Sequence, residues 1–410
     1  MKVVVVGSGG REHALAEVLG RHHTVIVTPG NPGIPGSTDT PAEELVTAGD
    51  VDLVVIGPEQ PLVDGLADRL RAAGVRVFGP DADGAQVEGS KAYMKDLLLA
   101  AGVPTARYGA FTDVEPALDF LRALPGPWVV KTDGLAAGKG VLVTTSLAEA
   151  EADVRQKLSG DAFGDAGRRV VIEEGLTGPE VSVFVVCDGQ RAVGLPAAQD
   201  FKRVGDGDVG PNTGGMGAWS PLPFVDDRFH QLVAERFVEP TLAELNRRGI
   251  DYRGVLYAGL MITPEGPKLI EYNIRFGDPD SQVVLLRLTS DLGELLAAAA
   301  DGNLDAVGEP SFSSDAAVLV VAASEGYPVS PRPGDVIDGI AAAEAVEGVT
   351  VLKAGVRTDD DGSLVTAGGR VLNVVGVAAD VATARARAYE AIGHISWPGE
   401  HHRSDVAASP

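Results

Sequence analysis

The sequence is poor in cysteine and in positive charge, and each shortage excludes a class of site or partner. Cys187 is the only cysteine among 410 residues, so an intrachain disulfide is impossible and a thiolate metal site cannot be built. We expect it to be a buried core residue on a strand. Lys and Arg number 34 against 58 Asp and Glu, a net charge of −24. This balance argues against nucleic acid or an anionic membrane as a partner, so local Lys and Arg clusters must hold any anionic ligand.

Long hydrophobic runs are also missing. The run at residues 1–6 is too short for a signal sequence, and the longest later run, 316–323, is far shorter than the ~20 residues that cross a bilayer. We therefore expect a cytoplasmic protein with no membrane partner. The seven histidines are scattered or adjacent in pairs, and adjacent side chains cannot point at one metal from a regular element, so no zinc site is predicted.

Glycine is abundant, and the most distinctive glycine-rich loop lies at residues 131–141. It separates two β-rich runs, 128–131 and 141–144, which predicts a hairpin whose tip can lie over a phosphate chain. Glycines let backbone N–H groups approach an anion, and lysines supply the countercharge. A surface hairpin that merely carries lysines would have the same pattern. A Walker A loop is excluded, because Gly134 and Gly138 are too close and Gly140 stands where Ser or Thr is needed.

Residues 1–103 repeat a pattern of strand followed by helix. Short β-branched runs are expected to be strands at 2–6, 24–27, 53–56 and 75–78. Helices are expected between them at 11–19, 42–48 and 62–73. This alternation predicts a small parallel α/β domain, in which ligands bind at the carboxyl ends of the strands.

The first turn of this domain, residues 7–12, is close to a dinucleotide-binding fingerprint. Glu12 stands in place of the third glycine, and the second strand does not end in an acidic residue, so NAD binding is disfavoured. A helix that begins behind glycines can still bind a phosphate. Loops at 29–33 and 57–65 also follow strands, although Pro, Gly and Asn there are equally typical of plain turns.

Ser90 is a plausible N-cap for a helix over 91–101, which puts Lys91 and Lys95 on one face. That face is either solvated or directed at a shared anion. In the run 268–275, alternation places Glu271, Asn273 and Arg275 on one face of a strand.

The opposite face of that strand, with Ile270, Tyr272 and Ile274, is expected to be core. A carboxylate, an amide oxygen and a guanidinium in a row suit a magnesium phosphate, because hard oxygens bind the cation and a planar donor binds phosphoryl oxygens. An ordinary exposed ion pair is the alternative. The long glycine-rich stretch at 199–217 favours a substrate loop over a disordered one.

Together these motifs resemble the ATP-grasp superfamily of carboxylate-amine ligases, and more specifically the phosphoribosylamine-glycine ligases. The resemblance is carried by the loop before Val141 and by the segments at 7–14, 173–180, 211–217 and 271–279. It implies an α/β fold in which an ATP-grasp domain with a small lid lies between an N-terminal parallel α/β domain and a C-terminal α+β domain. The expected boundaries are 1–103, 104–310 with the lid at about 120–188, and 311–410.

The resemblance also implies roles for individual residues. Lys91 and Lys131 would hold the ATP phosphates beneath Gly138, Lys139 and Gly140 of the lid. The backbone at Glu173, Glu174 and Leu176 would hold adenine, and Glu180 the ribose. Glu271 and Asn273 would bind Mg2+ or Mn2+, and Arg275 and Lys131 would be catalytic. The expected substrate-binding residues are Gly9, Gly10, Glu59, Asp200, Lys202, Arg203, Asn212, Thr213, Gly214, Gly215, Arg275 and Asp278.

The implied activity is the ATP-dependent ligation of glycine to 5-phosphoribosylamine in purine biosynthesis, through glycyl phosphate, by a monomeric enzyme. Two positions depart from the family pattern: Asp280 replaces a glutamate, and Phe201 replaces a histidine that is often present. Three alternatives stay open. They are an NAD-dependent oxidoreductase, a regulatory module that binds ATP without turning it over, and a biotin-type carboxylase that uses bicarbonate.

Overall fold

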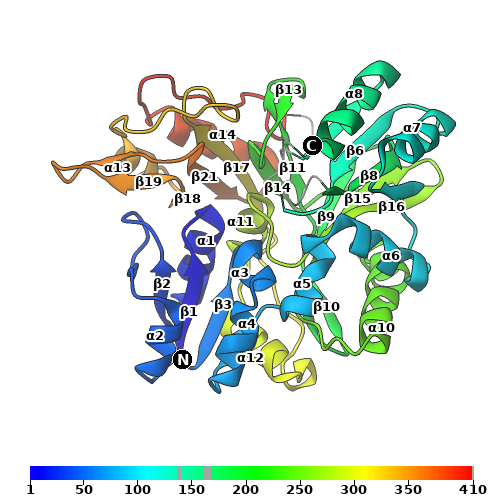
Figure 1. Ribbon diagram of the computed structural model, residues 1–410. Coiled ribbons are helices and arrows are strands. Elements are labelled where there is room, and N and C mark those ends of the chain that lie inside the picture. Colours follow the sequence, from blue (N-terminus) through cyan, green and yellow to red (C-terminus); the bar gives the residue numbers. More distant parts are fainter. Residues whose placement is uncertain (136–139, 161–167, 409–410) are drawn as a thin grey trace.

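A computed structural model of the chain describes residues 1–135, 140–160 and 168–408 (Figure 1). Within these residues the strands form four sheets of four or five strands and two short two-stranded ribbons. In the described part of the chain, no helix is both long enough and apolar enough to cross a membrane. The sheets meet around the helices α1 (Gly10–Leu19) and α11 (Asp280–Leu285), which pack against each other near the centre of Figure 1.

The N-terminal sheet is parallel, with the strand order β2-β1-β3-β4. Its strands are β1 (Lys2–Gly7), β2 (Thr24–Pro29), β3 (Leu53–Ile56) and β4 (Arg76–Phe78). The predicted parallel α/β domain is therefore confirmed. Besides α1, its helices are α2 (Ala42–Thr47), α3 (Glu59–Val63), α4 (Leu66–Ala72) and α5 (Ala82–Gly89).

The single helix predicted over 62–73 is wrong, because α3 and α4 are separate. Gly65, between them, has φ +74°, a left-handed conformation that interrupts a helix. Helix α6 (Lys91–Ala101) begins where it was predicted, and the Ser90 hydroxyl accepts a hydrogen bond from the Tyr93 N–H at 3.1 Å. This cap satisfies one of the free N–H groups of the first turn.

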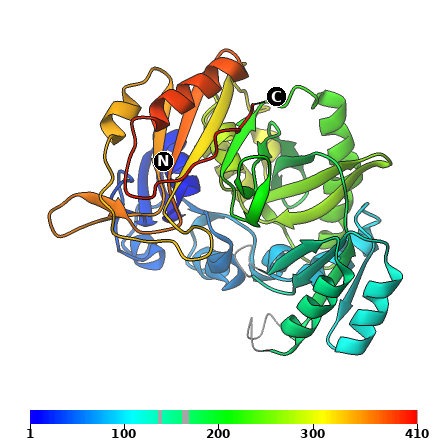
Figure 2. The same cartoon turned by 90° about the horizontal axis from the view of Figure 1, so that it is seen from above.

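A small antiparallel sheet with the order β5-β8-β6-β7 stands out from the rest of the molecule (Figure 2). Its strands are β5 (Tyr108–Phe111), β6 (Trp128–Thr132), β7 (Val141–Thr144) and β8 (Val170–Glu174), packed on α7 (Val114–Ala123) and α8 (Leu147–Leu158). The predicted hairpin of β6 and β7 is confirmed. This unit, called the lid below, has a hydrophobic core of its own that includes Leu118, Leu121, Val154 and Ile172.

The central sheet is antiparallel, with the order β10-β9-β15-β16. Its strands are β9 (Glu180–Asp188), β10 (Ala192–Gly194), β15 (Arg253–Thr263) and β16 (Gly266–Asn273). Cys187 on β9 is fully buried, as predicted. Because β8 belongs to the lid and β9 to the central sheet, the link at 175–179 crosses between them. Helices α9 (Asp227–Val233) and α10 (Glu239–Arg247), with the π-helical turn Ala234–Val238 between them, complete this part.

The alternation predicted for β16 is interrupted by a bulge. Gly259 pairs with Glu271, but the next residue, Leu260, pairs with Leu269, so Ile270 is left between them. Tyr272 and Ile274 are buried as predicted. Ile270 instead lines the same cleft as Glu271, so its assignment to the core face is wrong.

The third large sheet, β11-β14-β17-β21-β18, joins segments that are distant in sequence. Its strands are β11 (Gln199–Asp200), β14 (Gly217–Ser220), β17 (Ala316–Ala323), β18 (Val349–Lys353) and β21 (Arg370–Ala378), with α14 (Val381–Ile392) packed on β17 and β21. Part of the predicted substrate loop forms a ribbon of β12 (Arg203–Gly205) and β13 (Val209–Asn212). The other elements are α12 (Leu292–Asp301), the 3-10 turn Leu304–Ala306, α13 (Ile340–Glu344), β19 (Val356–Thr358) and β20 (Leu364–Thr366).

Candidate active site

A cleft of about 530 Å3 separates the lid from the central sheet. One part of its wall is apolar and the other is charged. The apolar part includes Val129, Val143, Leu176, Met261 and Ile270. The charged part includes Lys131, Glu173, Glu180, Asp200, Lys202 and Glu271. A ligand with a flat apolar end and an anionic end matches this division.

Lys131 and Glu173 lie on neighbouring lid strands and form a buried ion pair. The Lys131 Nζ is 2.8 Å from Glu173 Oε1, and the Lys95 Nζ is 2.8 Å from Glu173 Oε2. Burial disfavours the charged forms, but the two ammonium groups outweigh it and lower the pKa of Glu173. Burial lowers the pKa of Lys95 to about 8, against the opposing effect of Glu173. Lys95 is thus committed to Glu173 and does not share a ligand-facing surface with Lys91.

Lys91 stands at the first turn of α6 and is half-buried. Its Nζ donates a hydrogen bond to the backbone oxygen of Gly134, at 2.8 Å. Ser90 and the Ala92 N–H both contact Asp133 Oδ1, at 2.9 and 3.1 Å. The start of α6 is therefore tied to the loop that follows β6. Gly138 and Lys139 lie outside the described residues, whereas Gly140 accepts a hydrogen bond from the Thr132 N–H at 2.9 Å.

Lys202 links the predicted ribose residue to the predicted substrate loop. Its Nζ is 2.9 Å from both Glu180 Oε2 and Asp200 Oδ1. Its backbone oxygen accepts hydrogen bonds from the N–H and hydroxyl of Thr213, each at 2.8 Å. Arg203, Asn212 and Thr213 also line the cleft. Phe201, where a histidine was expected, instead stacks beneath the guanidinium of Arg403 at 4.9 Å.

Glu271 and Asn273 provide oxygen ligands of the type that Mg2+ or Mn2+ prefers. Among the described residues, the Glu271 carboxylate has no hydrogen-bond or ion-pair partner, and it lines the cleft. The described residues contain no group of three or more His, Cys, Asp and Glu arranged to hold a metal. The two side chains therefore fit a cation that takes its other ligands from phosphate and water, which is how magnesium is usually bound.

Arg275 lies just beyond β16 and is paired with two carboxylates. Its Nε is 3.2 Å from Glu59 Oε2, and its Nη2 is 2.9 Å from Glu88 Oε1 and 3.4 Å from Asn273 Oδ1. Burial raises the pKa of Glu88, and the nearby Glu59 adds to this effect although Arg275 opposes it. Arg275 thus joins the N-terminal domain to the predicted metal ligands, with much of its charge already compensated.

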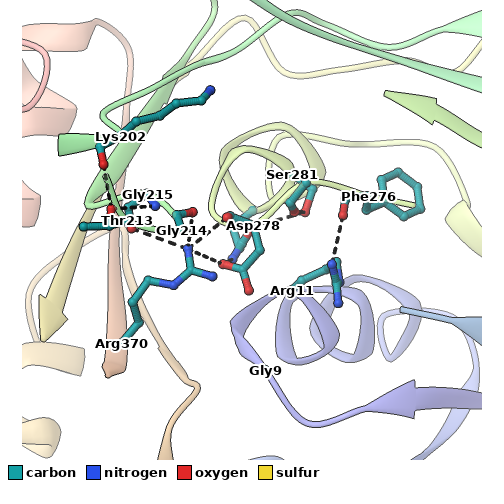
Figure 3. Close-up of polar contacts among 12 residues, drawn as sticks. Gly9, Arg11, Lys202, Thr213, Gly214, Gly215, Phe276, Asp278, Ser281 and Arg370 are labelled. Atoms are coloured by element: carbon teal, nitrogen blue, oxygen red, sulfur yellow. Dashed lines mark hydrogen bonds and ion pairs between the residues drawn. The ribbon is translucent and has the colours of Figure 1, made fainter. Parts of the chain in front are cut away.

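A second group of predicted residues lies where the N-terminal domain, α11 and the C-terminal sheet meet (Figure 3). Figure 3 shows Arg370 reaching from β21 toward the turn at 213–215 and toward Asp278. Its Nη1 donates to the backbone oxygens of Gly214 at 2.6 Å and Asp278 at 2.9 Å. A Cβ on Gly9 would lie 3.5 Å from Asp278 Oδ2, so the first glycine turn borders the same place.

Two residues of the first turn have structural partners. The Glu12 carboxylate accepts a hydrogen bond from the Gly9 N–H at 2.7 Å and closes the start of α1. Gly10 is packed against Asn373, since an added Cβ would lie 2.0 Å from its amide nitrogen. The His13 Nδ1 accepts a hydrogen bond from the Lys353 N–H at 2.8 Å, and burial lowers the pKa of His13 to about 4. The contacts with Asn373 and Lys353 dock α1 on the C-terminal sheet.

Sequence reasoning missed Glu88 and Arg370. Glu88 is an ordinary helical carboxylate in sequence, and only the fold brings it to Arg275. Arg370 is 92 residues from Asp278, and no local motif connects them. The sequence offered no signal for either residue.

Comparison with known proteins identifies the family. Profiles of the N domain, the ATP-grasp (A) domain and the C domain of phosphoribosylglycinamide synthetase match residues 1–88, 89–281 and 317–409. A phosphoribosylamine-glycine ligase of Escherichia coli O6:H1 is 49% identical, over 99% of this chain and 98% of its own. The chain belongs to the phosphoribosylamine-glycine ligase family. The predicted carbon-nitrogen ligase with an ATP-grasp fold, in purine biosynthesis, is thereby confirmed.

Solved structures agree with this membership of the phosphoribosylamine-glycine ligase family. The crystal structure of the Thermotoga maritima phosphoribosylamine-glycine ligase superposes with a TM-score of 0.85 at 34% identity, covering 99% of this chain and 100% of that one. The biotin carboxylase domain of Hydrogenobacter thermophilus 2-oxoglutarate carboxylase, in complex with MgADP, ADP and bicarbonate, has a TM-score of 0.71 at 16% identity, covering 98% of this chain and 91% of that one. At that identity the likeness shows the fold alone.

Proposed function

We propose that the chain joins glycine to 5-phosphoribosylamine at the expense of ATP, through glycyl phosphate, giving glycinamide ribonucleotide, ADP and phosphate. The observation that supports this most directly is the division of the cleft between the lid and the central sheet. An apolar wall faces a wall that carries Lys131, Lys202 and Glu271, whose carboxylate has no partner in the described part of the chain. A purine base and a metal-bound triphosphate match these two walls.

ATP would lie with adenine between the lid strands and the central sheet. Val143, Met261 and Ile270 offer apolar contacts, and the backbone at 173–176 offers polar groups for the edge of the base. Glu180, already held by Lys202, would accept hydrogen bonds from a ribose. Lys91 and Lys131 would face the phosphates, with Gly140 in the lid above them.

Glu271 and Asn273 would hold Mg2+ or Mn2+. When bound, the cation would withdraw electron density from the terminal phosphoryl group and offset its charge. Lys131 and Arg275 would be the chain's own cationic groups at this place. Their positions are fixed by Glu173 on one side and by Glu59 and Glu88 on the other. Fixed cations need no reorganisation when charge develops, which is how such sites lower a barrier.

The carboxylate of glycine would attack the γ-phosphorus, and ADP would leave. The amine of phosphoribosylamine would then attack the carbonyl carbon of glycyl phosphate, and phosphate would leave with one of glycine's carboxylate oxygens. No protein nucleophile is required. Cys187 is fully buried, and the neutral His13 ring accepts a hydrogen bond from Lys353.

The second group of residues would hold phosphoribosylamine. Gly9, Gly10, Glu59, Asp278 and the turn at 213–215 surround the junction of the three domains. Arg370 adds a guanidinium that is only partly exposed. We further propose that the enzyme is a cytoplasmic monomer with the domain boundaries at 103/104 and 310/311.

The test measures ADP release with each substrate left out in turn. We expect ADP only when glycine and phosphoribosylamine are both present, together with a divalent cation. Equal ADP formation without glycine would contradict the proposal, and so would dependence on bicarbonate instead. ATP binding without any turnover would favour the regulatory module. A titration with NADH that leaves its fluorescence unchanged would dismiss the oxidoreductase.

A further inference from the structure

Behind the charged wall of the cleft lies a buried carboxylate that the proposed roles do not use. Asp280 begins α11, only 2% of its surface is exposed, and its Oδ1 has no hydrogen-bond partner among the described residues. A Cβ on Gly277 would lie 3.1 Å from Asp280 Oδ2 and 2.9 Å from the ring of Tyr257. Asp280 is therefore held tightly against β15. A carboxylate oxygen that is buried without a hydrogen-bond partner lowers the stability of the fold, so its presence suggests a functional role.

The neighbours of Asp280 leave an excess of negative charge. Burial raises the pKa of both Asp280 and Asp200. The charge of Asp200 adds to the effect on Asp280, and the charge of Glu180 adds to the effect on Asp200, while Lys202 opposes both. Lys202 is the nearby cation, but its Nζ already pairs with Asp200 and Glu180. The carboxylates of Asp200, Glu180 and Asp280 thus share one ammonium group. The missing positive charge must be supplied by a proton or by a bound cation.

The other elements packed around Asp280 do not supply the missing positive charge. Ser182 on β9 and Tyr257 on β15 are neutral, and their hydroxyl groups lie 2.8 Å apart. The strands β14 and β17, which pack on α11, carry no titratable side chain. Helix α1 also packs on α11, but it supplies no free positive charge. Its Arg11 is paired with Glu12 at 2.5 Å, and its His13 is neutral.

We infer that Asp200 and Asp280 form the receptor for the ammonium group of glycine, and that a proton occupies their place when glycine is absent. Glycine enters as a zwitterion, and the ammonium would displace the shared proton to solvent. Asp200 lines the cleft and would make the direct contact, with Asp280 supplying the second charge from behind. Asp280 is thus a specificity-determining residue, and this inference rests on the proposed function.

This arrangement also gives the two amines of the reaction different protonation states. Phosphoribosylamine must reach the carbonyl as a neutral amine, whereas the amine of glycine must not attack glycyl phosphate. Two carboxylates close to the glycine nitrogen keep it protonated, because opposite charges favour the charged form. A divalent metal is disfavoured here relative to a singly charged ammonium, since Lys202 lies within hydrogen-bond distance of Asp200 and repels a doubly charged ion more strongly.

The test follows the KM for glycine between pH 6 and 8.5 with ATP and phosphoribosylamine saturating. Burial and Asp200 raise the pKa of Asp280 to about 7. Below that pH the ammonium must expel a proton, so the KM for glycine should rise about tenfold per pH unit while the KM for ATP stays level. A KM for glycine that is flat with pH in the native enzyme would overturn the inference without any variant.

Two probes separate recognition of the ammonium from a structural role. In Asp280→Asn the KM for glycine at pH 8 should rise roughly 30-fold or more, and its pH dependence should disappear. Inhibition by glycolate, which has a hydroxyl in place of the ammonium, should be unchanged. Asp280→Glu should recover most of the affinity for glycine. Asp188→Asn, which removes another buried carboxylate, 4% exposed and absent from the lining of this cleft, should keep the native pH profile.

Equal weakening of glycine and glycolate by Asp280→Asn would show that the pair is merely structural and would overturn the inference. Failure of Asp280→Asn to fold would leave the decision to the native pH profile and to Asp280→Glu. If the native enzyme releases no glycine-dependent ADP, the proposed function fails instead.

Discussion

At the scale of single residues, the site depends on charges that are paired before any ligand arrives. Lys131 is held by Glu173, Arg275 by Glu59 and Glu88, and Lys202 by Glu180 and Asp200. Each cation is thus fixed in position and partly compensated. Glu271 is different, because its carboxylate faces the cleft without a partner among the described residues. This contrast makes Glu271 the side chain most available to a metal.

Glu271→Gln should reduce turnover by at least ~100-fold with little change in the melting temperature, because a metal ligand is lost while the shape is kept. Leu269→Ala is the matched control on the same strand. Leu269 is fully buried, so its truncation should cost about 2–5 kcal/mol of stability. Steady-state rates and thermal unfolding measure both. Full activity in Glu271→Gln would contradict the assignment.

Glu173→Gln should destabilise the protein by about 3–5 kcal/mol at pH 7, because two buried ammonium groups lose their partner. The pKa of Glu173 is lowered in the folded state. Its contribution is therefore present above the unfolded pKa and is lost as pH falls through the folded pKa. Urea unfolding of the two proteins should show a gap that narrows in acid.

Glu151, which is partly exposed at the surface and paired with Arg122, provides the control for this measurement. Glu151→Gln should leave unfolding unchanged, since exposed ion pairs contribute little. A stability gap between the native protein and Glu173→Gln that widens in acid would show that the buried cluster has been misinterpreted.

At the scale of elements, the hairpin of β6 and β7, the cap of α6 and the parallel order of the first strands could all be predicted from local pattern. Two features could not. The bulge at Ile270 depends on how β16 pairs with β15, and the residue pattern of β16 alone does not predict it. The break between α3 and α4 depends on Gly65 taking a left-handed conformation, whereas glycine is also tolerated inside helices.

The lid has its own core and joins the central sheet through the link at 175–179, so it can open and close as a unit. Binding of a non-hydrolysable ATP analogue should slow amide hydrogen exchange in β6 and β8 by at least ~10-fold. Exchange in β1, which lies outside the cleft, should stay the same. Hydrogen-exchange mass spectrometry resolves these segments. An equal effect on β1, or none on the lid, would argue against closure over ATP.

At the scale of the whole molecule, the C-terminal sheet takes in β11 and β14 from the middle of the chain. The sequence predicted three domains and the family. It did not predict that one sheet would combine strands from the central and C-terminal domains. Pairing between strands about a hundred residues apart is set by the complete fold. Arg370 is the clearest consequence, because it reaches the predicted substrate turn from a strand to which sequence assigned no role.

Arg370→Lys should raise the KM for phosphoribosylamine roughly 10-fold or more while the KM for ATP stays within about twofold. Lysine keeps the charge, but its ammonium group cannot reproduce the contacts that the planar guanidinium group makes with the backbone carbonyls of Gly214 and Asp278. Arg357, exposed on β19, provides the control, and Arg357→Lys should leave both constants unchanged. Equal losses for ATP and phosphoribosylamine would indicate a general loosening of the fold.

The central claim is that glycine is activated as glycyl phosphate, and one isotope measurement tests it most directly. Glycine labelled with oxygen-18 in its carboxylate is turned over with ATP and phosphoribosylamine, and the released phosphate is analysed by mass spectrometry. We predict one labelled oxygen per phosphate, because the carboxylate oxygen that attacks ATP leaves with the phosphoryl group. Unlabelled phosphate would contradict the account and would point to attack by water or by a group of the protein.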